Sequence, residues 1–339
     1  MTTIGHDLTP LEHGGGLRAA ARRYGTPAEG WLDLSTGINP NGWPLPHAID
    51  PKLWQRLPER EDGLEEAAAE CYGLPHPPLP LAGSQAAIQA LARLRPTGET
   101  ACLAPLYGEH PHAWLQSGHP LHLPTTVAEV ERLLDRLDTL VVVNPNNPTG
   151  GALEPDQLLA WADHLSRRNG VLVVDEAFMD ATPERSVAPH AHRRGLVVLR
   201  SLGKFFGLAG ARVGFAAGDS EIITRLAHHL GPWTVSGPAR HIAHQALEDR
   251  AWQASTRPKL HAASQRLATL LTSTGLHPDG GTALFQWLRS DAARGIQERL
   301  ARQGILVRAF DAPSSLRFGL PPGHDAAWHR LEKALREHA

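Results

Sequence analysis

The chain has 339 residues, of which 42% are hydrophobic and 20% are charged, a composition that suits one large hydrophobic core or two linked ones. Its formal net charge of -2 and its lack of long runs of like charge argue against a nucleic acid or an anionic membrane as a partner. No apolar stretch approaches the ~20 residues that span a bilayer, and no secretory signal is visible, so we expect a cytoplasmic protein.

The N-terminal forty residues are rich in glycine and proline, and we expect them to pack on a smaller domain or across an active site. The middle of the chain alternates short apolar runs with amphipathic stretches, which is typical of a parallel sheet covered by helices. Between two of the apolar runs, residues 158–165 place apolar side chains at helical spacing, and Asn169-Gly170 supplies a stop. The expected buried strands are residues 101–105, 139–145, 170–178, 195–202 and 212–218.

The C-terminal third has a different pattern, with long helices expected at about 238–249 and 253–274 and short strands in FQWLRS and GILVRAF. We therefore predict an α/β protein in which residues 45–235 form a large domain. Residues 1–44 together with 236–339 should form a smaller α+β domain. The two cysteines, Cys71 and Cys102, do not have metal-ligand spacing, and we expect no metal site.

The most informative segment is residues 200–215, RSLGKFFGLAGARVGF. It places Lys204 just beyond an apolar strand, where ligands gather in open α/β sheets. Ser201 and Arg212 could both reach an anion there, and the glycines between them allow close backbone approach. The alternative interpretation is an exposed lysine in a glycine-rich loop.

Three other segments carry polar residues at comparable places. Asp175 follows a fully apolar run, where an unpaired carboxylate is costly to bury. Asn147 lies in NPNNPTG after another strand, although this sequence would also make a plain turn. Gly83 and Ser84 open a helical pattern whose free N–H groups suit a phosphate, although most such pairs are simple helix caps.

Together, in this order and spacing, the four segments resemble the fold-type I pyridoxal-phosphate enzymes of the aspartate aminotransferase superfamily, class I/II branch. The resemblance covers roughly residues 30–320. It implies a mostly parallel seven-stranded sheet in the large domain and pyridoxal 5'-phosphate as the cofactor. It also implies a homodimer that acts on a small molecule, because active sites in this superfamily form at a dimer interface.

The resemblance assigns a role to each matching residue. Lys204 would form the Schiff base and carry protons, Asp175 would pair with the pyridinium nitrogen, and Asn147 would donate to the ring oxygen. Tyr107 would stack on the ring, and Arg317 would grip the substrate carboxylate with its planar fork. The cofactor phosphate would be held by Gly83, Ser84, Gln85, Ser201 and Arg212.

Two positions depart from the family pattern. Phe178 replaces the tyrosine of the usual DEAY, so a hydroxyl that donates to the ring oxygen is missing. Leu57 stands in QRLP, where relatives often place a tyrosine that reaches the cofactor phosphate of the other subunit. Both departures argue against a standard transaminase.

The N-terminal region narrows the resemblance. The motifs LEHGG and LSTGINPNG, together with RSLGKFFGLAG, look like the threonine-phosphate decarboxylases of cobalamin biosynthesis, which are related to histidinol-phosphate aminotransferases. Both families act on a small phosphorylated amine. The resemblance implies that Arg308, His13 and Gly14 bind the substrate phosphate and that Gly37 and Asn147 also contact the substrate. A flexible arm and two unrelated strand arginines remain the alternatives at the level of the residues.

The resulting prediction is the decarboxylation of L-threonine O-3-phosphate to (R)-1-amino-2-propanol O-2-phosphate and CO2. Residue identities do not decide between decarboxylation and transamination, because the Cα bond that stands perpendicular to the cofactor ring is the one that breaks. A histidinol-phosphate-type aminotransferase is therefore the alternative enzyme. A non-catalytic regulatory module that binds pyridoxal phosphate is less favoured, because Lys204, Asp175 and Arg212 are all present and few residues precede the matched region.

Overall fold

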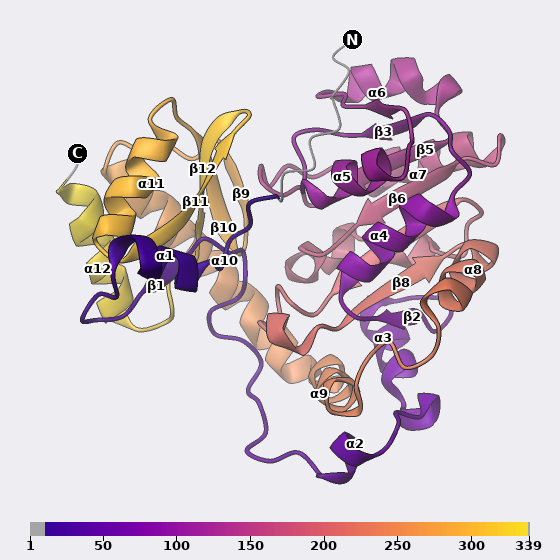
Figure 1. Cartoon of the computed structure of the whole chain (residues 1–339), viewed down its shortest axis with the longest axis horizontal. Coiled ribbons are helices and arrows are strands. Elements are labelled where there is room, and N and C mark those ends of the chain that lie inside the picture. Colours follow the sequence, from indigo (N-terminus) through magenta and orange to yellow (C-terminus); the bar gives the residue numbers. More distant parts are fainter. Residues whose placement is uncertain (1–10, 338–339) are drawn as a thin grey trace. The chain divides into compact units, whose positions relative to one another are not determined.

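The computed structural model describes residues 11–337, and their contacts divide them into two units (Figure 1). The large unit contains Trp43–Asn147 and Ala152–Trp252, and the small unit contains Glu12–Gly42, Pro148–Gly151 and the chain from Gln253 onward. Among residues 11–337, no helix is both long and apolar enough to cross a membrane.

The division between the units falls inside helix α10 (Arg250–Ser273), whereas the sequence analysis placed it at residue 235. The reason is helix α9 (Gly237–Glu248), which packs on helix α3 (Leu64–Tyr72) and so belongs to the large unit. The two long helices expected near this point are α9 and α10.

The large unit is built on a seven-stranded sheet with the order β2-β8-β7-β6-β5-β3-β4. Five neighbouring strands, from β4 to β7, run parallel, while β8 is antiparallel to both of its neighbours. The predicted seven-stranded, mostly parallel sheet is confirmed, although β2 and β4 are too short to give a recognisable apolar run. The strands are β2 (Leu79–Leu81), β3 (Thr100–Cys102), β4 (Leu121–His122), β5 (Thr139–Val143), β6 (Val171–Asp175), β7 (Leu196–Ser201) and β8 (Gly214–Gly218).

Alternate residues of the central strands point to one face of this sheet, where they form a buried apolar cluster with three helices. The helices are α4 (Ser84–Leu94), α5 (Glu109–Gln116) and α8 (Ser220–Leu230). This packing fixes where β6 and β7 end, and therefore where the polar residues at those ends lie. The cluster includes Ile88, Leu91, Trp114, Val141, Val173, Val197, Leu199 and Leu226.

The predicted helix between β5 and β6 is α7 (Pro155–Ser166). Pro155 occupies its first turn, where a missing N–H costs nothing, and the apolar positions at helical spacing are buried. After the helix, Asn169 adopts a left-handed φ of 61°, which turns the chain into β6. Since β5 and β6 are adjacent and parallel, β5–α7–β6 is the crossover unit that the sequence predicts.

The small unit has a five-stranded sheet with the order β1-β11-β12-β10-β9. Helices α1 (Leu17–Tyr24), α11 (Ala293–Arg302) and α12 (Asp325–Arg336) belong to this unit. β10 and β11 were expected, whereas β12 follows β11 after so short a turn that its separate strand was not predicted. The strands are β1 (Leu32–Leu34), β9 (Gly280–Thr282), β10 (Phe285–Arg289), β11 (Ile305–Asp311) and β12 (Ser314–Gly319).

Candidate active site

One cavity of the large unit brings together the polar side chains that the sequence places at the strand ends. It lies where β5, β6 and β7 end, beside the start of α4. Every residue predicted to bind the cofactor lines it, and Phe178 lies among them. The lining residues are Gly83, Ser84, Gln85, Tyr107, Val143, Asn147, Asp175, Ala177, Phe178, Ser201, Lys204 and Arg212.

The start of α4 and Arg212 form an anion-binding corner of this cavity. Gly83 has a φ of 75°, and a Cβ there would lie 2.6 Å from Arg212 Nη2, so the guanidinium rests directly on the glycine backbone. A Cβ on Gly214 would lie 2.6 Å from the backbone nitrogen of Ser84. Free N–H groups at a helix start and an adjacent guanidinium attract an anion together. A phosphate ester has the charge and the oxygens that this corner needs.

Asp175 is held in one orientation at the end of β6, although only 3% of its surface is exposed. Its Oδ1 accepts a hydrogen bond from the Ala177 backbone N–H (3.0 Å), and its Oδ2 lies 2.9 Å from His110 Nε2. An ionised carboxylate can only accept, so the buried His110 ring donates to it. The buried carboxylate is thereby stabilised and aimed, as a partner for a protonated ring nitrogen must be.

His110 is a further candidate site residue, and the sequence analysis did not predict it. It stands three residues after Tyr107, at the beginning of α5, and the two rings meet edge to face with centroids 6.3 Å apart. Residues at this spacing lie on one side of a helical turn. The spacing of Tyr107 and His110 in LYGEH was therefore the sequence signal that could have placed His110 beside Tyr107 in the site.

Lys204 and Asn147 are positioned by short local structures. Lys204 Nζ lies 5.4 Å from the centre of the Phe178 ring, so an aromatic face stands where the family usually has a tyrosine. Asn147 follows Asn146, whose Nδ2 donates to the Pro105 carbonyl at 2.7 Å and ties the NPNNPTG turn to the Tyr107 segment. Gln85 lines the cavity, but its amide also donates to Glu109 at 2.5 Å.

A buried ion network lies directly behind the ends of β6 and β7. Arg200 binds Glu176 (2.8 Å) and Asp180 (2.5 Å), and Glu176 also accepts from the Val187 N–H. Burial disfavours the charge on Arg200, but the Asp180 and Glu176 carboxylates outweigh this and raise the pKa of Arg200. Because Glu176 follows Asp175 and Arg200 precedes Ser201, the network holds both site residues in place.

The small unit has a cavity of its own, of about 370 Å³, lined by His13 and Arg308 among others. In the β11–β12 register, Arg308 is directly opposite Arg317, so the two side chains leave the same face of the sheet about 5 Å apart. Arg317 donates to the Ser35 carbonyl at 2.8 Å. The register therefore places the two arginines that the sequence predicts for the substrate anions side by side on the sheet, but only Arg308 is among the residues that line this cavity.

The glycine-rich arm of the small unit is packed tightly against Ser35. A Cβ on Gly14 would lie 2.3 Å from the Ser35 carbonyl oxygen, so no larger residue fits there. The Gly15 N–H donates to Ser35 Oγ at 2.7 Å, and this hydroxyl donates to Asp33. Ser35 lies in the LSTGINPNG motif, but the sequence alone indicates no role for it. Gly37 is buried after β1 and lines neither of the two cavities described so far.

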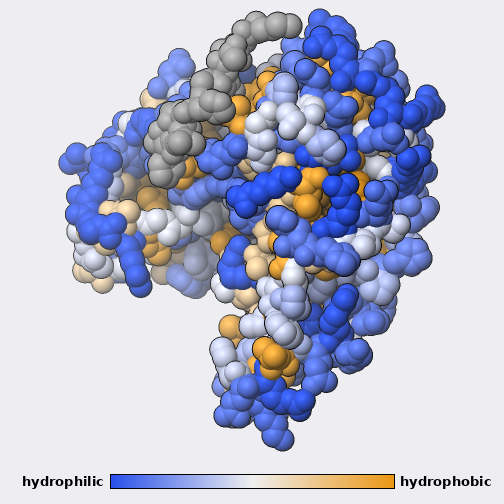
Figure 2. Space-filling view, turned by 45° about the vertical axis from the view of Figure 1, so that its right-hand side comes forward, coloured by the Kyte–Doolittle hydropathy of each residue, from blue (hydrophilic) through white to orange (hydrophobic). Residues whose placement is uncertain are grey.

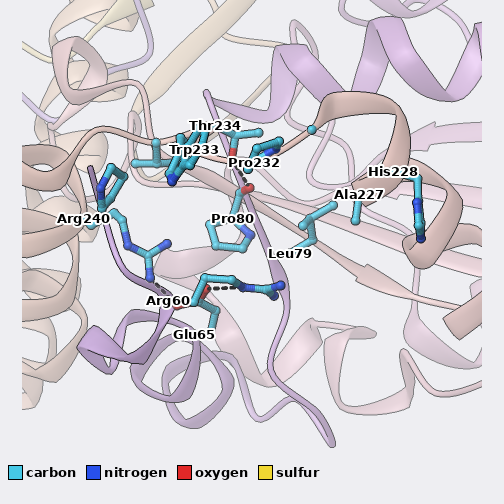
Figure 3. A pocket seen from close by; sticks show the side chains of 13 residues that line it. Arg60, Glu65, Leu79, Pro80, Ala227, His228, Pro232, Trp233, Thr234 and Arg240 are labelled. Carbon is cyan, nitrogen blue, oxygen red and sulfur yellow. Dashed lines mark hydrogen bonds and ion pairs between the residues drawn. The ribbon is translucent and has the colours of Figure 1, made fainter. Parts of the chain in front are cut away.

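A third cavity, of about 440 Å³, lies elsewhere in the large unit (Figure 3). Figure 3 shows Arg60, Glu65 and Arg240 on one side of it and Trp233 and Thr234 near Pro80 on the other. Arg240 is bound to Asp62 at 2.7 Å and to Glu65 at 2.6 Å, so its charge is already satisfied. This cavity lacks the combination of an amine, an aligned carboxylate and an anion cradle that the Lys204 cavity has.

The chain is similar to known proteins both in sequence and in fold. Residues 52–335 match the family model described as aminotransferase class I and II. The chain is 58% identical to the threonine-phosphate decarboxylase of Pseudomonas aeruginosa, over 96% of this chain and 97% of the relative. It is 44% identical to that of a Sinorhizobium species, over 96% and 98%. In fold it is similar to histidinol-phosphate aminotransferase from Clostridium acetobutylicum, with a TM-score of 0.80 and 19% identity, over 90% and 98%.

Proposed function

Because the chain belongs to the family of class I and II aminotransferases, we propose that it is a pyridoxal-phosphate-dependent threonine-phosphate decarboxylase. It converts L-threonine O-3-phosphate into (R)-1-amino-2-propanol O-2-phosphate and CO2. The two sequence relatives carry the name of this decarboxylase at 58% and 44% identity. The structural observation that carries the proposal is the register that places Arg308 opposite Arg317. Threonine phosphate has two anionic groups a few bonds apart, one for each guanidinium.

The cavity of the large unit fits pyridoxal phosphate residue by residue. Arg212, Ser84 and the N–H groups at the start of α4 would hold its phosphate, and Gly83 leaves the space that this requires. Asp175, aligned by His110, would pair with its ring nitrogen. When bound, the cofactor supplies an electron sink for the electron pair that the departing carboxylate leaves on Cα.

The remaining residues of this cavity bind, orient and move protons. Lys204 would hold the cofactor before substrate arrives, and its Nζ would then return a proton to Cα after CO2 has left. The C–C bond to the carboxylate breaks, a C–H bond forms at Cα, and no oxidant is needed. The apolar faces of Phe178 and Val143 limit water around the amine, which strengthens the charge interactions inside.

The arginine pair of the small unit would set the conformation of the substrate. Arg308 and His13, which both line the cavity of the small unit, would bind the phosphate. The family resemblance adds the Gly14 backbone to this phosphate site and assigns the carboxylate to Arg317, which is opposite Arg308 in the sheet. Fixing both ends of a short substrate restricts rotation about its Cα, which selects the bond to be broken. Substrates that lack the phosphate would lose this restriction.

The proposal is tested by incubating the purified protein, loaded with cofactor, with threonine phosphate. We expect one CO2 and one aminopropanol phosphate per substrate consumed, and no requirement for a 2-oxo acid. Transfer of the amine from histidinol phosphate to 2-oxoglutarate, without CO2 release from threonine phosphate, would replace the decarboxylase with an aminotransferase. Absence of both reactions, with the cofactor bound, would favour a non-catalytic module.

A homodimer, a cytoplasmic location and a role in cobalamin biosynthesis are parts of the same proposal. The large unit exposes large apolar side chains at Leu45, Trp54, Leu57 and Trp233, between 58% and 68% accessible. Three of them lie on the segment around helix α2 (Lys52–Gln55). Figure 2 shows a small hydrophobic area near the lower end of the face in view. Exposed apolar patches commonly mark protein–protein interfaces. Sedimentation analysis of wild type and of Trp54→Lys would test the dimer.

A further inference from the structure

Glu12, the residue before His13, forms an ion pair with the guanidinium group of Arg308. Its Oε2 lies 3.2 Å from Arg308 Nη1 and 3.3 Å from Arg294 Nη1. The backbone carbonyl of Glu12 accepts a second hydrogen bond, from Arg308 Nη2. All of these residues line the cavity of the small unit.

The two arginines depend on Glu12 to different degrees. Arg294 also binds Asp311, at 2.7 Å, whereas no other carboxylate among residues 11–337 lies within ion-pair distance of Arg308. The Arg308 side chain is only 13% exposed, while that of Glu12 is 59% exposed. Burial lowers the pKa of Arg308, and the Glu12 carboxylate opposes this effect. A mostly buried cation therefore relies on an exposed and weakly held anion.

A phosphate ester is suited to replace the Glu12 carboxylate. At neutral pH it carries close to two negative charges and three acceptor oxygens, against one charge and two oxygens on a carboxylate. Displacing an exposed carboxylate costs little. The bond from Arg308 Nη2 to the Glu12 carbonyl and the bond from Gly15 to Ser35 do not involve the carboxylate. The arm can therefore stay anchored while the Glu12 side chain leaves.

We propose that Glu12 is a positioning residue that acts through Arg308. Its carboxylate holds the Arg308 guanidinium in place between turnovers and yields that position to the substrate phosphate. The inference rests on the proposed function, in which Arg308 binds this phosphate. Glu12 then competes with the phosphorylated product as well as with the substrate, so it weakens substrate binding and promotes product release.

The test is Glu12→Gln in the full chain loaded with cofactor, because this change removes the charge and keeps the size of the side chain. The KM for threonine phosphate and the inhibition constant of inorganic phosphate should both fall about two- to fivefold, the range expected for an ion pair whose carboxylate is exposed. The value of kcat should not rise, because the product also binds more tightly. The cofactor absorbance should not change.

Glu298→Gln is the matched control. Glu298 lines the same cavity, but its carboxylate is bound by Arg23 (2.8 Å) and Tyr24 (2.5 Å) rather than by Arg308. We expect this variant to keep the wild-type KM. An equal fall in KM in both variants would overturn the inference, because it would reflect only the loss of negative charge from the cavity. An unchanged or raised KM in Glu12→Gln alone would also overturn it.

A direct binding measurement separates this inference from the proposed function. Calorimetric titration with inorganic phosphate needs no turnover, and Glu12→Gln should bind phosphate two- to fivefold more tightly than wild type. If wild type releases no CO2 from threonine phosphate, the proposed function fails, whereas the phosphate titration still reports on the exchange at Arg308. If CO2 is released but phosphate affinity does not respond to Glu12→Gln, the inference alone fails.

Discussion

The Lys204 cavity of the large unit and the Arg308 cavity of the small unit are assembled in different ways. Residues of the Lys204 cavity come from short motifs, each at the end of a strand or the start of a helix in one sheet. Residues of the Arg308 cavity come from two distant parts of the chain, the N-terminal arm with α1 and Ser35 and the C-terminal segment with α11 and β11. Glu12 and Arg308, one from each part, are 296 residues apart. The first depends on local backbone geometry, and the second depends on strand register and packing of the arm.

This difference separates two kinds of mutational effect. Changes in the Lys204 cavity should alter cofactor binding and chemistry, whatever the substrate. Changes around Arg308 should leave the cofactor spectrum intact and alter the KM for phosphorylated substrates. A variant that violates this separation would show that the two cavities do not act independently.

The largest effect is expected from Lys204→Ala. Without the amine, the variant loses both the covalent attachment of the cofactor and the proton donor for Cα, and kcat/KM should fall at least about a thousandfold. The measurements are CO2 release and the visible absorbance of the bound cofactor. Residual activity above about 0.1 per cent of wild type would contradict the assigned role of Lys204.

The next effect is expected from Gly83→Ala. The added Cβ would lie 2.6 Å from Arg212 Nη2 at a φ of 75°, so it strains the backbone and pushes the guanidinium away from the anion-binding corner. Overpacking of this kind costs about 1–3 kcal/mol, so the affinity for the cofactor should fall about 5- to 150-fold. Gly210→Ala is the control, since a Cβ at Gly210 meets nothing within 4 Å. Equal loss in both variants would argue against a specific cradle.

The contrast also explains how much the sequence could predict. The parallel sheet and the residues of the Lys204 cavity could be predicted from the sequence, because buried strands appear in it as continuous apolar runs and the polar residues follow these runs directly. The short strands β2, β4 and β9 were not predicted, since two or three residues carry no period. His110 was missed because its partner Asp175 is 65 residues away and only the fold brings them together.

In the small unit the sequence predicted residues but not their partners. Arg308 and Arg317 were both assigned to substrate anions, yet their pairing depends on a turn between β11 and β12 that sets the register. The role of Glu12 could not be inferred from LEHGG, because its carboxylate acts on a residue near the other end of the chain. The boundary between the units also escaped prediction, because the helical pattern of α9 does not show on which neighbour the helix packs.

A smaller effect, confined to the Arg308 cavity of the small unit, is expected from Gly14→Ala. The added Cβ would overlap the Ser35 carbonyl, at 2.3 Å, so the arm must move away from Ser35 and would displace His13, the residue before Gly14. The KM for threonine phosphate should rise about tenfold, because an overpacking cost near 1.4 kcal/mol corresponds to this factor. The cofactor absorbance should stay as in wild type. Gly16→Ala, whose Cβ meets nothing within 4 Å, should keep the wild-type KM.

The smallest effect is expected from Asp279→Asn, at a site that supports the small sheet without lining either cavity. The Arg289 N–H (2.7 Å) and then its guanidinium (3.0 Å) donate to Asp279 and lower the pKa of this carboxyl group. A carboxyl group whose pKa is lower in the folded state than in the unfolded state stabilises the protein at pH values above its unfolded-state pKa. This stabilisation is lost as the pH falls through the folded-state pKa. Since the pair is near the surface, the free energy of unfolding should drop by at most about 1 kcal/mol at pH 7.

The measurement is urea unfolding of wild type and Asp279→Asn between pH 7 and the acid limit of the folded state. The difference between the two should shrink as the pH approaches the folded pKa, because protonated Asp279 resembles asparagine in charge. Following far-UV circular dichroism and cofactor absorbance together sharpens the comparison of the two regions. A lower midpoint by circular dichroism, with the cofactor signal unshifted, would show that the small unit loses stability without disturbing the Lys204 cavity. A difference that persists undiminished in acid would instead assign the effect to side-chain geometry rather than to charge.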